Sequence, residues 1–187
     1  MQPVRLAYVR GVTPAKWVRI WEERMRRVPL ELTLVDAPQQ TSSLRDGLAD
    51  MAFVRLPIDR EGLHAIPLYE ERPMVVVPKD HAIAAADEVT LAEVEELGAP
   101  VHPFDPLVED TLALVAAGVG STVLPQSVAR LHSRRDLVFK PVTDVPPTVI
   151  ALAWLSDPEP PRTENEQHRI DTFIGIVRGR TRNSSRG

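Results

Sequence analysis

The chain has 187 residues and a formal net charge of −4, and 43% of its residues are hydrophobic and 26% charged. These values are typical of a folded globular protein with one domain or two small lobes, and they argue against disorder, a fibrous repeat and a surface built for nucleic acid. Because the chain has no cysteine, disulfides, thiolate metal sites and a cysteine nucleophile are excluded. No apolar run approaches the roughly 18 residues of a membrane span and no secretory signal opens the chain, so we expect a cytoplasmic protein.

The first half of the chain alternates strand and helix patterns. Short apolar runs mark the strands, and apolar residues three or four positions apart mark the helices. In chain order we predict a strand over 4–9, a helix over 14–28, a strand over 30–36, a short helix between Thr41 and Gly47, a strand over 51–56 and extended segments over 63–68 and 73–78. The opening order of strand, helix and strand favours parallel pairing, because the connection has the length of a crossover.

The second half of the chain continues with shorter elements. Thr90 and Glu93 have the spacing of a capping box, which marks the start of a helix. In chain order we predict a helix over 90–97, a short strand over 101–103, a helix over 107–118, a strand over 121–125, a helix over 126–132, strands over 137–142 and 148–155, a proline-rich loop over 156–161 and a terminal helix with an apolar stripe over 170–177. The 18 prolines gather at the joints, which supports these assignments. The pattern predicts an α/β protein with open parallel sheets, which bind small molecules beyond the carboxyl ends of their strands.

Three segments of the chain together resemble the effector-binding domain of LysR-type transcriptional regulators. They are Leu44–Val54, Pro67–His81 and Val115–Pro125, and they occur in the order found in that family. The resemblance extends over most of residues 4–177. It implies an α/β fold with two Rossmann-like lobes joined by crossing strands, like type 2 periplasmic binding proteins, and a small effector bound in the cleft between the lobes.

The resemblance also implies a domain organisation. Lobe I would comprise residues 1–72 and 146–178, and lobe II residues 73–145. Residues 179–187 would form a basic flexible tail, because four of the last ten residues are arginine and none is acidic. A solvated tail is the favoured interpretation, with contact to an acidic partner or a phosphate as the alternative.

The sequence departs from the family pattern at two places. Members normally begin with a winged helix-turn-helix, whereas the first strand here begins at Val4, so DNA binding is not carried over. Only a few residues separate the strand at Val101 from the helix at Leu107, where the family usually has a further strand and helix. We therefore expect a shortened second lobe.

The turn after the first strand is the first candidate for ligand binding. It precedes a helix, whose free N–H groups and partial positive charge suit a carboxylate, and Lys16 lies in the first turn, where a cation is unfavourable without a nearby anion. The resemblance places effector contacts at this turn. We therefore predict ligand contacts from Arg10, Gly11, Val12 and Thr13. The alternative is that Thr13 only caps the helix and that Lys16 points into solvent.

Three further residues are candidate ligand contacts. Arg55 follows the third strand and could pair with a carboxylate of the effector, or alternatively with Asp59 or Glu61 on the surface. His102 and Ser121 lie at strand ends of the second lobe and are predicted to face the cleft. A purely structural role is the alternative for His102, because isolated histidines are more often structural than functional.

Motifs for other chemistries are missing from the sequence. The five histidines do not have zinc-binding spacing, and the Gly-x-Ser-x-Gly motif of serine hydrolases is absent. Gly118 and Gly120 follow a helix and precede a strand, which is the reverse of a dinucleotide site. We therefore expect no enzymatic activity, no metal and no cofactor.

These observations lead to one main hypothesis and one alternative. The main hypothesis is a LysR-type substrate-binding domain that senses a small metabolite, with a carboxylate as the favoured class, and acts in transcription regulation through protein contacts. Its partners would be the effector and either a second copy or another regulator, without direct DNA or membrane binding. The alternative is a ligand-free dimerisation or interaction module that pairs with itself or with a full-length regulator.

Overall fold

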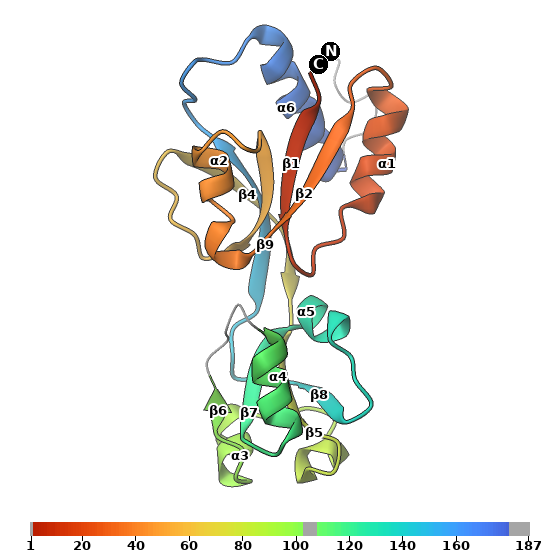
Figure 1. The fold of residues 1–187 in the computed structure, drawn as a ribbon, viewed down its shortest axis with the longest axis vertical. Coiled ribbons are helices and arrows are strands. Elements are labelled where there is room, and N and C mark those ends of the chain that lie inside the picture. The colour runs from red at the N-terminus through yellow and green to blue at the C-terminus, as the bar shows by residue number, and fades with distance from the viewer. Residues whose placement is uncertain (1, 103–107, 180–187) are drawn as a thin grey trace. The chain divides into compact units, whose positions relative to one another are not determined.

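The computed structural model describes residues 2–102 and 108–179, and the chain divides into two compact units. Unit 1 comprises Met1–Tyr69 and Val149–Gly187, and unit 2 comprises Glu70–Thr148. The chain passes between the units twice, in strand β4 (Leu63–Glu71) and at the start of strand β9 (Thr148–Leu155) (Figure 1). The lobe boundaries predicted from the sequence, after residues 72 and 145, lie three residues from these crossings and stay predictions of the domain organisation.

Unit 1 is built on a five-stranded mixed sheet with the strand order β2-β1-β3-β9-β4. The strands not yet named are β1 (Val4–Val9), β2 (Leu30–Val35) and β3 (Met51–Leu56). Strand β1 pairs in parallel with β2 and β3, whereas β9 is antiparallel to β3. The prediction of open parallel sheets is therefore wrong in this half of the sheet. The physical reason is that β9 returns from unit 2 without the helical crossover that parallel pairing requires.

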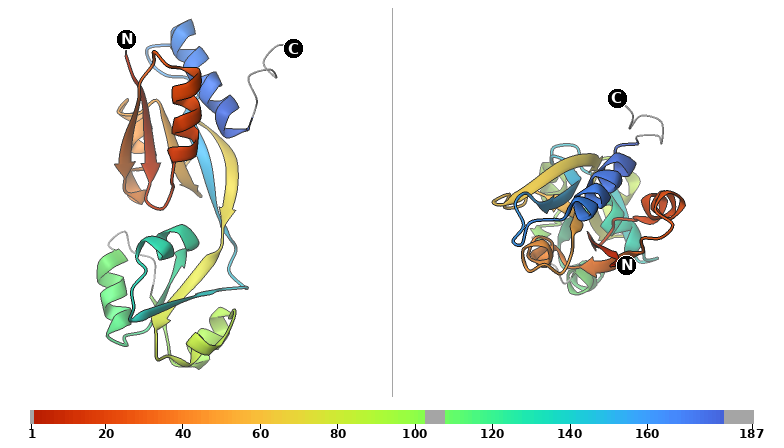
Figure 2. Two further views of the ribbon diagram at one scale, coloured as in Figure 1. Left: turned by 90° about the vertical axis from the view of Figure 1, so that its right-hand side faces the viewer. Right: turned by 90° about the horizontal axis from the view of Figure 1, so that it is seen from above.

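Helices cover both faces of this sheet. They are α1 (Ala15–Arg24), α2 (Ser42–Arg45) and α6 (Glu164–Val177), with a 3-10 turn over Ala37–Gln39. Figure 2 shows α1 and α6 on one side of the strands, where Phe53 and the other buried residues of that face pack against them. Ala52 and Val54 point to the opposite face and pack against Leu44 of α2. Successive residues of β3 thus serve two hydrophobic layers, as the period of two in a strand requires.

An aromatic cluster joins α1 and α6 to the sheet. Trp21 is fully buried, and its ring meets Phe173 edge to face with 5.8 Å between the centroids. Trp17 stacks on Phe53 at 4.7 Å. The Trp21 indole N–H donates to the carbonyl of Val28 at 2.8 Å, and this bond fixes the segment that follows α1. The predicted helix over 14–28 is therefore too long, because the chain leaves the helix after Arg24 and this segment packs against the cluster instead.

Strand β4 contains an exposed proline in its interior. Pro67 is an exception to the predicted clustering of prolines at joints, because it falls within Leu63–Glu71. Strand β4 is at the edge of its sheet, and an edge strand tolerates proline because one row of its backbone groups has no ladder partner.

Unit 2 is built on a four-stranded mixed sheet with the order β6-β7-β5-β8. The strands are β5 (Pro73–Pro78), β6 (Val101–His102), β7 (Ser121–Pro125) and β8 (Leu137–Pro141). The central strand β5 is antiparallel to both β7 and β8, and only β6 and β7 are parallel among the pairs of this sheet. The expectation of a parallel sheet is thus wrong in this unit as well, for β5 enters from unit 1 and β8 leads back towards it.

The helices of unit 2 also form two layers. They are α3 (Leu91–Glu96), α4 (Val108–Ala116) and α5 (Gln126–Leu131), with a 3-10 turn over Ala82–Ala85. Met74 and Val76 pack against α4 and α5, whereas Val75 and Val77 pack against the 3-10 turn and α3. The predicted capping box is confirmed, because Thr90 and Glu93 each accept a hydrogen bond from the backbone N–H of the other.

Two predicted features fall outside the described residues. The junction over 103–107 is one of them, so the shortened second lobe stays a prediction, and residues 180–187 of the predicted basic tail are the other. Within the described ranges, no helix combines the length and the apolar character needed to cross a membrane.

Trp21 provides a test of the aromatic cluster. We expect Trp21→Ala to lower the free energy of unfolding by about 3–5 kcal/mol, because it opens a cavity beneath α1 and α6. Trp21→Phe keeps most of the volume but removes the N–H bond to Val28, and a loss of about 1–2 kcal/mol is expected. Urea denaturation followed by circular dichroism measures both. Leu48→Ala is the control, because that side chain is 68% exposed. A loss below about 1 kcal/mol for Trp21→Ala would contradict the described packing.

Candidate functional site

The parallel strands β1, β2 and β3 finish at the same end of the unit 1 sheet, which is called here the C-end. Arg10 follows β1, Asp36 follows β2, and Arg55 is the next-to-last residue of β3. A guanidinium N–H of Arg55 donates to the carbonyl of Arg10 at 3.2 Å. Arg10 itself forms a long ion pair with Asp36, with 3.5 Å between nitrogen and oxygen. The structure therefore brings together Arg10 and Arg55, two of the residues that the sequence singled out.

The side chain of Gln40 holds the backbone of Arg55 from the outside. Its carboxamide oxygen accepts from the Arg55 N–H at 2.8 Å, and its NH₂ group donates to the Arg55 carbonyl at 3.1 Å. These two hydrogen bonds have the pattern that a neighbouring strand would form, and they orient the end of β3. Sequence reasoning missed Gln40, because a glutamine in a loop carries no signal that separates it from its neighbour Gln39.

The surface alternative for Arg55 can be compared with the observed contacts. Asp59 pairs with Arg45 at 2.8 Å, and the carbonyl of Glu61 accepts from the same guanidinium at 3.2 Å. The N–H of Glu61 donates to the Asp59 carboxylate, and this bond is the main cause that lowers the pKa of Asp59. Asp59 and Glu61, the surface residues considered as alternative partners of Arg55, therefore bind the guanidinium of Arg45.

The turn after β1 holds the predicted ligand contacts Gly11, Val12 and Thr13. Val12 is buried in the aromatic cluster, and its N–H donates to the carbonyl of Val9 at 3.2 Å. Val12 therefore has a structural role in this turn, and its ligand contact stays a prediction. Thr13 does not cap α1, because Pro14 occupies the capping position and no side chain of the described residues caps this helix. Gly11 has a φ of 96°, a conformation that suits glycine.

Lys16 has a partner in the protein. Its ammonium lies over the ring of Trp17, 4.2 Å from the centroid, which is cation–π geometry. The aromatic ring therefore accounts for a cation in the first turn of α1. The position of Lys16 no longer argues for an anion at this helix start, and the case for a ligand there depends on Arg10 and Arg55.

In unit 2, the two predicted ligand residues pack into the β6–β7 junction. The Nε2 atom of His102 lies 2.8 Å from the carbonyl oxygen of Val119. Ser121 is fully buried, and its hydroxyl donates to the carbonyl of Ala99 at 3.0 Å. Ser121 therefore has a structural role at this junction, and its ligand contact stays a prediction. His102 is half-buried, so its ligand-binding role stays a prediction beside the structural role that its contact supports.

The described residues contain no group of three histidine, aspartate or glutamate side chains that could hold a metal ion. What the C-end offers is guanidinium groups at the finish of parallel strands. Guanidinium groups recognise carboxylates through paired N–H donors.

The comparisons with known proteins agree with this architecture. Residues 11–101 match the model of the LysR substrate binding domain. The chain carries a LysR substrate binding domain. The expectation of a binding domain rather than an enzyme is confirmed by this match and by a similar transcriptional regulator, CatR of Pseudomonas putida, which is 28% identical over 166 residues.

Two similar regulators show how much of a longer protein the chain represents. The CatR match covers 72% of this chain and 57% of CatR. The Hca operon transcriptional activator HcaR of Escherichia coli K12 is 24% identical over 180 residues, which cover 81% of this chain and 57% of HcaR. The chain therefore spans a little over half the length of these relatives.

Solved structures confirm the predicted fold class. The reduced form of OxyR superposes with a TM-score of 0.73 at 18% identity, over 98% of this chain and 97% of that chain. The effector binding domain of BenM with its effector benzoate superposes with a TM-score of 0.68 at 21% identity, over 96% of this chain and 95% of that chain. This LysR-type domain thus has the α/β, two-lobed, periplasmic binding protein-like fold of type 2.

Gly120 tests the packing around His102. Its φ is 70°, and a Cβ atom there would lie 2.5 Å from the carbonyl oxygen of Pro100 and 2.6 Å from the Nε2 atom of His102. Gly120→Ala should lower the free energy of unfolding by about 3 kcal/mol or more, because it adds a clash to the cost of a left-handed alanine. Gly118→Ala is the matched control, for it has a φ of 81° and open space around the new atom, so a loss of about 1–2 kcal/mol is expected. Equal losses in urea denaturation would contradict the described junction.

Proposed function

We propose that this LysR-type domain is the sensing part of a transcription regulator and binds a small carboxylate at the C-end of the unit 1 sheet. The observation that carries the proposal is the contact between Arg55 and the carbonyl of Arg10. It places the guanidinium group of Arg55 against the backbone of Arg10 at the finish of parallel strands, where open α/β sheets bind small molecules. Gly11 and Thr13 complete the proposed contact surface on the turn between β1 and α1.

The ion pair of Arg10 can be exchanged for another anion. Arg10 has Asp36 as a partner only at 3.5 Å, and the side chains of both residues are about half exposed, so this ion pair is weak and easily exchanged. A carboxylate that approached both arginines would gain charge-assisted hydrogen bonds that the long ion pair does not provide.

The similar structures support a carboxylate over an oxidant. BenM is described with its effector benzoate, which is a carboxylate. Some other relatives are described as hydrogen peroxide-inducible genes activators, such as a probable one from Mycobacterium leprae. A thiol-based response to peroxide requires cysteine, and this chain has none. The interlobe cleft implied by the resemblance, with His102 contributing from the second lobe, stays a prediction, as does a role in transcription through protein contacts.

Arginine variants test the C-end site. A panel of benzoate, phenylacetate and hexanoate is titrated by calorimetry, and we expect at least one to bind the wild type. Arg55→Leu and Arg10→Leu should each weaken one binding component at least tenfold, because each removes a charge-assisted hydrogen bond worth about 1.5–3 kcal/mol. Arg60→Leu is the control, for Arg60 is an exposed arginine of the same unit. Unchanged isotherms for both variants, or no binding by any member of the panel, would contradict the proposal.

One observation favours the alternative of a self-pairing module. Strand β2 is at the edge of its sheet, and Leu32 and Leu34 on one of its faces are 42% and 46% exposed. An edge strand with apolar side chains is a surface suited to a second chain.

The double variant Leu32→Lys and Leu34→Lys tests pairing through β2. If two copies pair there, the wild type should have twice the monomer mass by light scattering, and the variant should have the monomer mass, because the new ammonium groups would be desolvated in the interface. Leu48→Lys, on an exposed loop, is the control and should leave the mass unchanged. A wild type that is monomeric at every concentration tested removes this alternative.

A further inference from the structure

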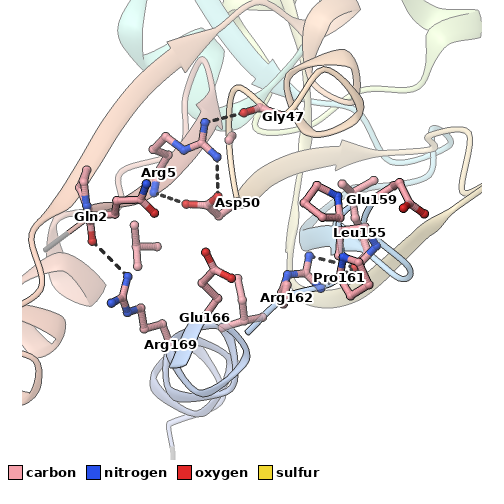
Figure 3. Close-up of a pocket in the computed structure, with 16 residues that line it drawn as sticks. Gln2, Arg5, Gly47, Asp50, Leu155, Glu159, Pro161, Arg162, Glu166 and Arg169 are labelled. Carbon is pink, nitrogen blue, oxygen red and sulfur yellow. Dashed lines mark hydrogen bonds and ion pairs between the residues drawn. The ribbon is translucent and has the colours of Figure 1, made fainter. Parts of the chain in front are cut away.

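A pocket lies at the end of the unit 1 sheet opposite to the C-end, which is called here the N-end. It has a volume of about 490 Å³, which falls within the range of small-molecule sites. The start of β1, the loop before β3 and the segment between β9 and α6 line it, as Figure 3 shows. None of its lining residues belongs to the C-end site. An inference about this pocket therefore does not rest on the proposed function.

One ion pair of the pocket forms within the protein, between Arg5 and Asp50. A guanidinium N–H of Arg5 donates to Asp50 at 2.7 Å, and the backbone N–H of Arg5 donates to the second carboxylate oxygen at 2.8 Å. Arg5 also donates to the carbonyl of Gly47. This network raises the pKa of Arg5, chiefly through the hydrogen bond to Asp50. Both carboxylate oxygens of Asp50 are used within the protein, so this pair contributes no net charge to a ligand.

Arg162 is different, because its partners are neutral. Both of its terminal nitrogens donate to a single acceptor, the carbonyl of Leu155, at 3.1 Å. Within residues 2–102 and 108–179, no carboxylate oxygen forms an ion pair with it at 4.0 Å or less. The side chain is half-buried, and desolvation lowers the pKa of Arg162 from its ordinary value. A guanidinium has five N–H donors, so most of its capacity remains for a bound group.

The charged side chains that line the pocket are equal in number, with Arg5, Arg162 and Arg169 opposed by Asp50, Glu159 and Glu166. Arg169 donates to the carbonyl of Gln2 at 3.1 Å, which is again a neutral partner. Glu166 lies between Arg162 and Arg169 in Figure 3. One of its oxygens accepts from the N–H and the hydroxyl of Thr163, both at 2.8 Å, and these bonds lower the pKa of Glu166. Glu166 is thus an ionised cap of α6, and its charge acts on both Arg162 and Arg169. The remaining acid of the lining, Glu159, is exposed to solvent.

The other walls of the pocket are apolar. Val4 and Ile170 are buried at its floor, and Leu155, Pro160 and Pro161 close one side. Proline and leucine carbons offer no hydrogen-bond partner to a polar ligand body, but they bury an apolar one favourably. The pocket therefore combines an apolar wall with two arginines, Arg162 and Arg169, that have no ion pair at 4.0 Å or less within the described residues.

We propose that the N-end pocket is a second ligand site, which takes a small monocarboxylate with an apolar body and binds its carboxylate through Arg162. The apolar body lies against Ile170 and the prolines, and the carboxylate accepts the N–H groups that Leu155 leaves unused. Because the charged anchor and the apolar wall are both contained in unit 1, the site is complete within that unit.

The experiment reads this pocket directly by methyl NMR. Protein with ¹³C-labelled isoleucine methyl groups is titrated with benzoate, phenylacetate and hexanoate, and the Ile170 signal is assigned with Ile170→Val. We expect the Ile170 methyl signal to shift with at least one of them in a saturable way, and benzamide, which has the shape of benzoate without its charge, to leave the signal in place. An Ile170 signal that none of the three carboxylates shifts at concentrations up to about 10 mM, a bound of roughly −2.7 kcal/mol, overturns the proposal.

Variants identify the anchor. Arg162→Leu should weaken the affinity measured at Ile170 at least tenfold, Arg162→Lys should weaken it less, and the control Arg60→Leu should leave it unchanged. If Arg162→Leu does not fold, Arg169→Gln replaces it as the test variant. We expect Arg169→Gln to lower the affinity measured at Ile170 at least threefold. An Ile170 titration that is the same in Arg162→Leu, or in Arg169→Gln if the former does not fold, overturns the assignment.

The same titration separates this site from the C-end site. Arg55→Leu should not change the Ile170 titration, because Arg55 lies at the other end of the sheet. If Arg55→Leu and Arg10→Leu leave the calorimetric isotherms unchanged while Arg162→Leu removes binding, the C-end proposal fails and the N-end proposal stands. If Arg162→Leu leaves binding unchanged while Arg55→Leu and Arg10→Leu weaken it, the N-end proposal fails and the C-end proposal stands.

Discussion

The aromatic cluster of unit 1 is the interaction on which its other features depend. Trp21 and Phe173 meet edge to face beneath the sheet, and Phe53 of β3 contacts both Trp17 and Phe173. These residues come from α1, β3 and α6, so one hydrophobic cluster fixes an early helix, a central strand and the last helix of the described chain. The start of α1 determines where Arg10 lies, and the start of α6 determines where Arg162 lies. Both candidate sites are therefore positioned by the same core.

The two ends of the unit 1 sheet present different chemistry because strand direction assigns their residues. At the C-end, strands β1, β2 and β3 finish, with Arg10 and Asp36 just beyond β1 and β2 and Arg55 near the end of β3. At the N-end, the same strands begin, and the antiparallel strand β9 brings Leu155 there from the opposite direction. The reversal of β9 thus supplies the carbonyl that holds Arg162, and an all-parallel sheet would not have placed it there.

The sequence predicted the elements better than their pairing. The strands over 51–56, 73–78, 121–125 and 148–155 were found at their observed bounds, because short apolar runs between turn residues are a local signal. Strand direction is not local: β5 and β9 link the two units, and nothing within either run shows that its neighbour will be antiparallel. Arg10 and Arg55 were singled out because they lie at strand ends, but their mutual contact was not predicted. Gln40 and the N-end pocket were missed, since Arg5, Asp50 and Arg162 come together only after folding.

The partners of a charged residue are more informative than its position in a motif. Val12 and Ser121 lie within segments for which ligand contact was predicted, yet both are buried. The Val12 N–H and the Ser121 hydroxyl each donate to a backbone carbonyl. Arg5 is held by a carboxylate, and a ligand would have to compete with that ion pair. Arg162 is held by a carbonyl, so a carboxylate that reaches it adds a charge-assisted bond without breaking an existing ion pair. For this reason Arg162 is better suited than Arg5 to respond to an anion, and Arg169, which is held by the carbonyl of Gln2, shares this property.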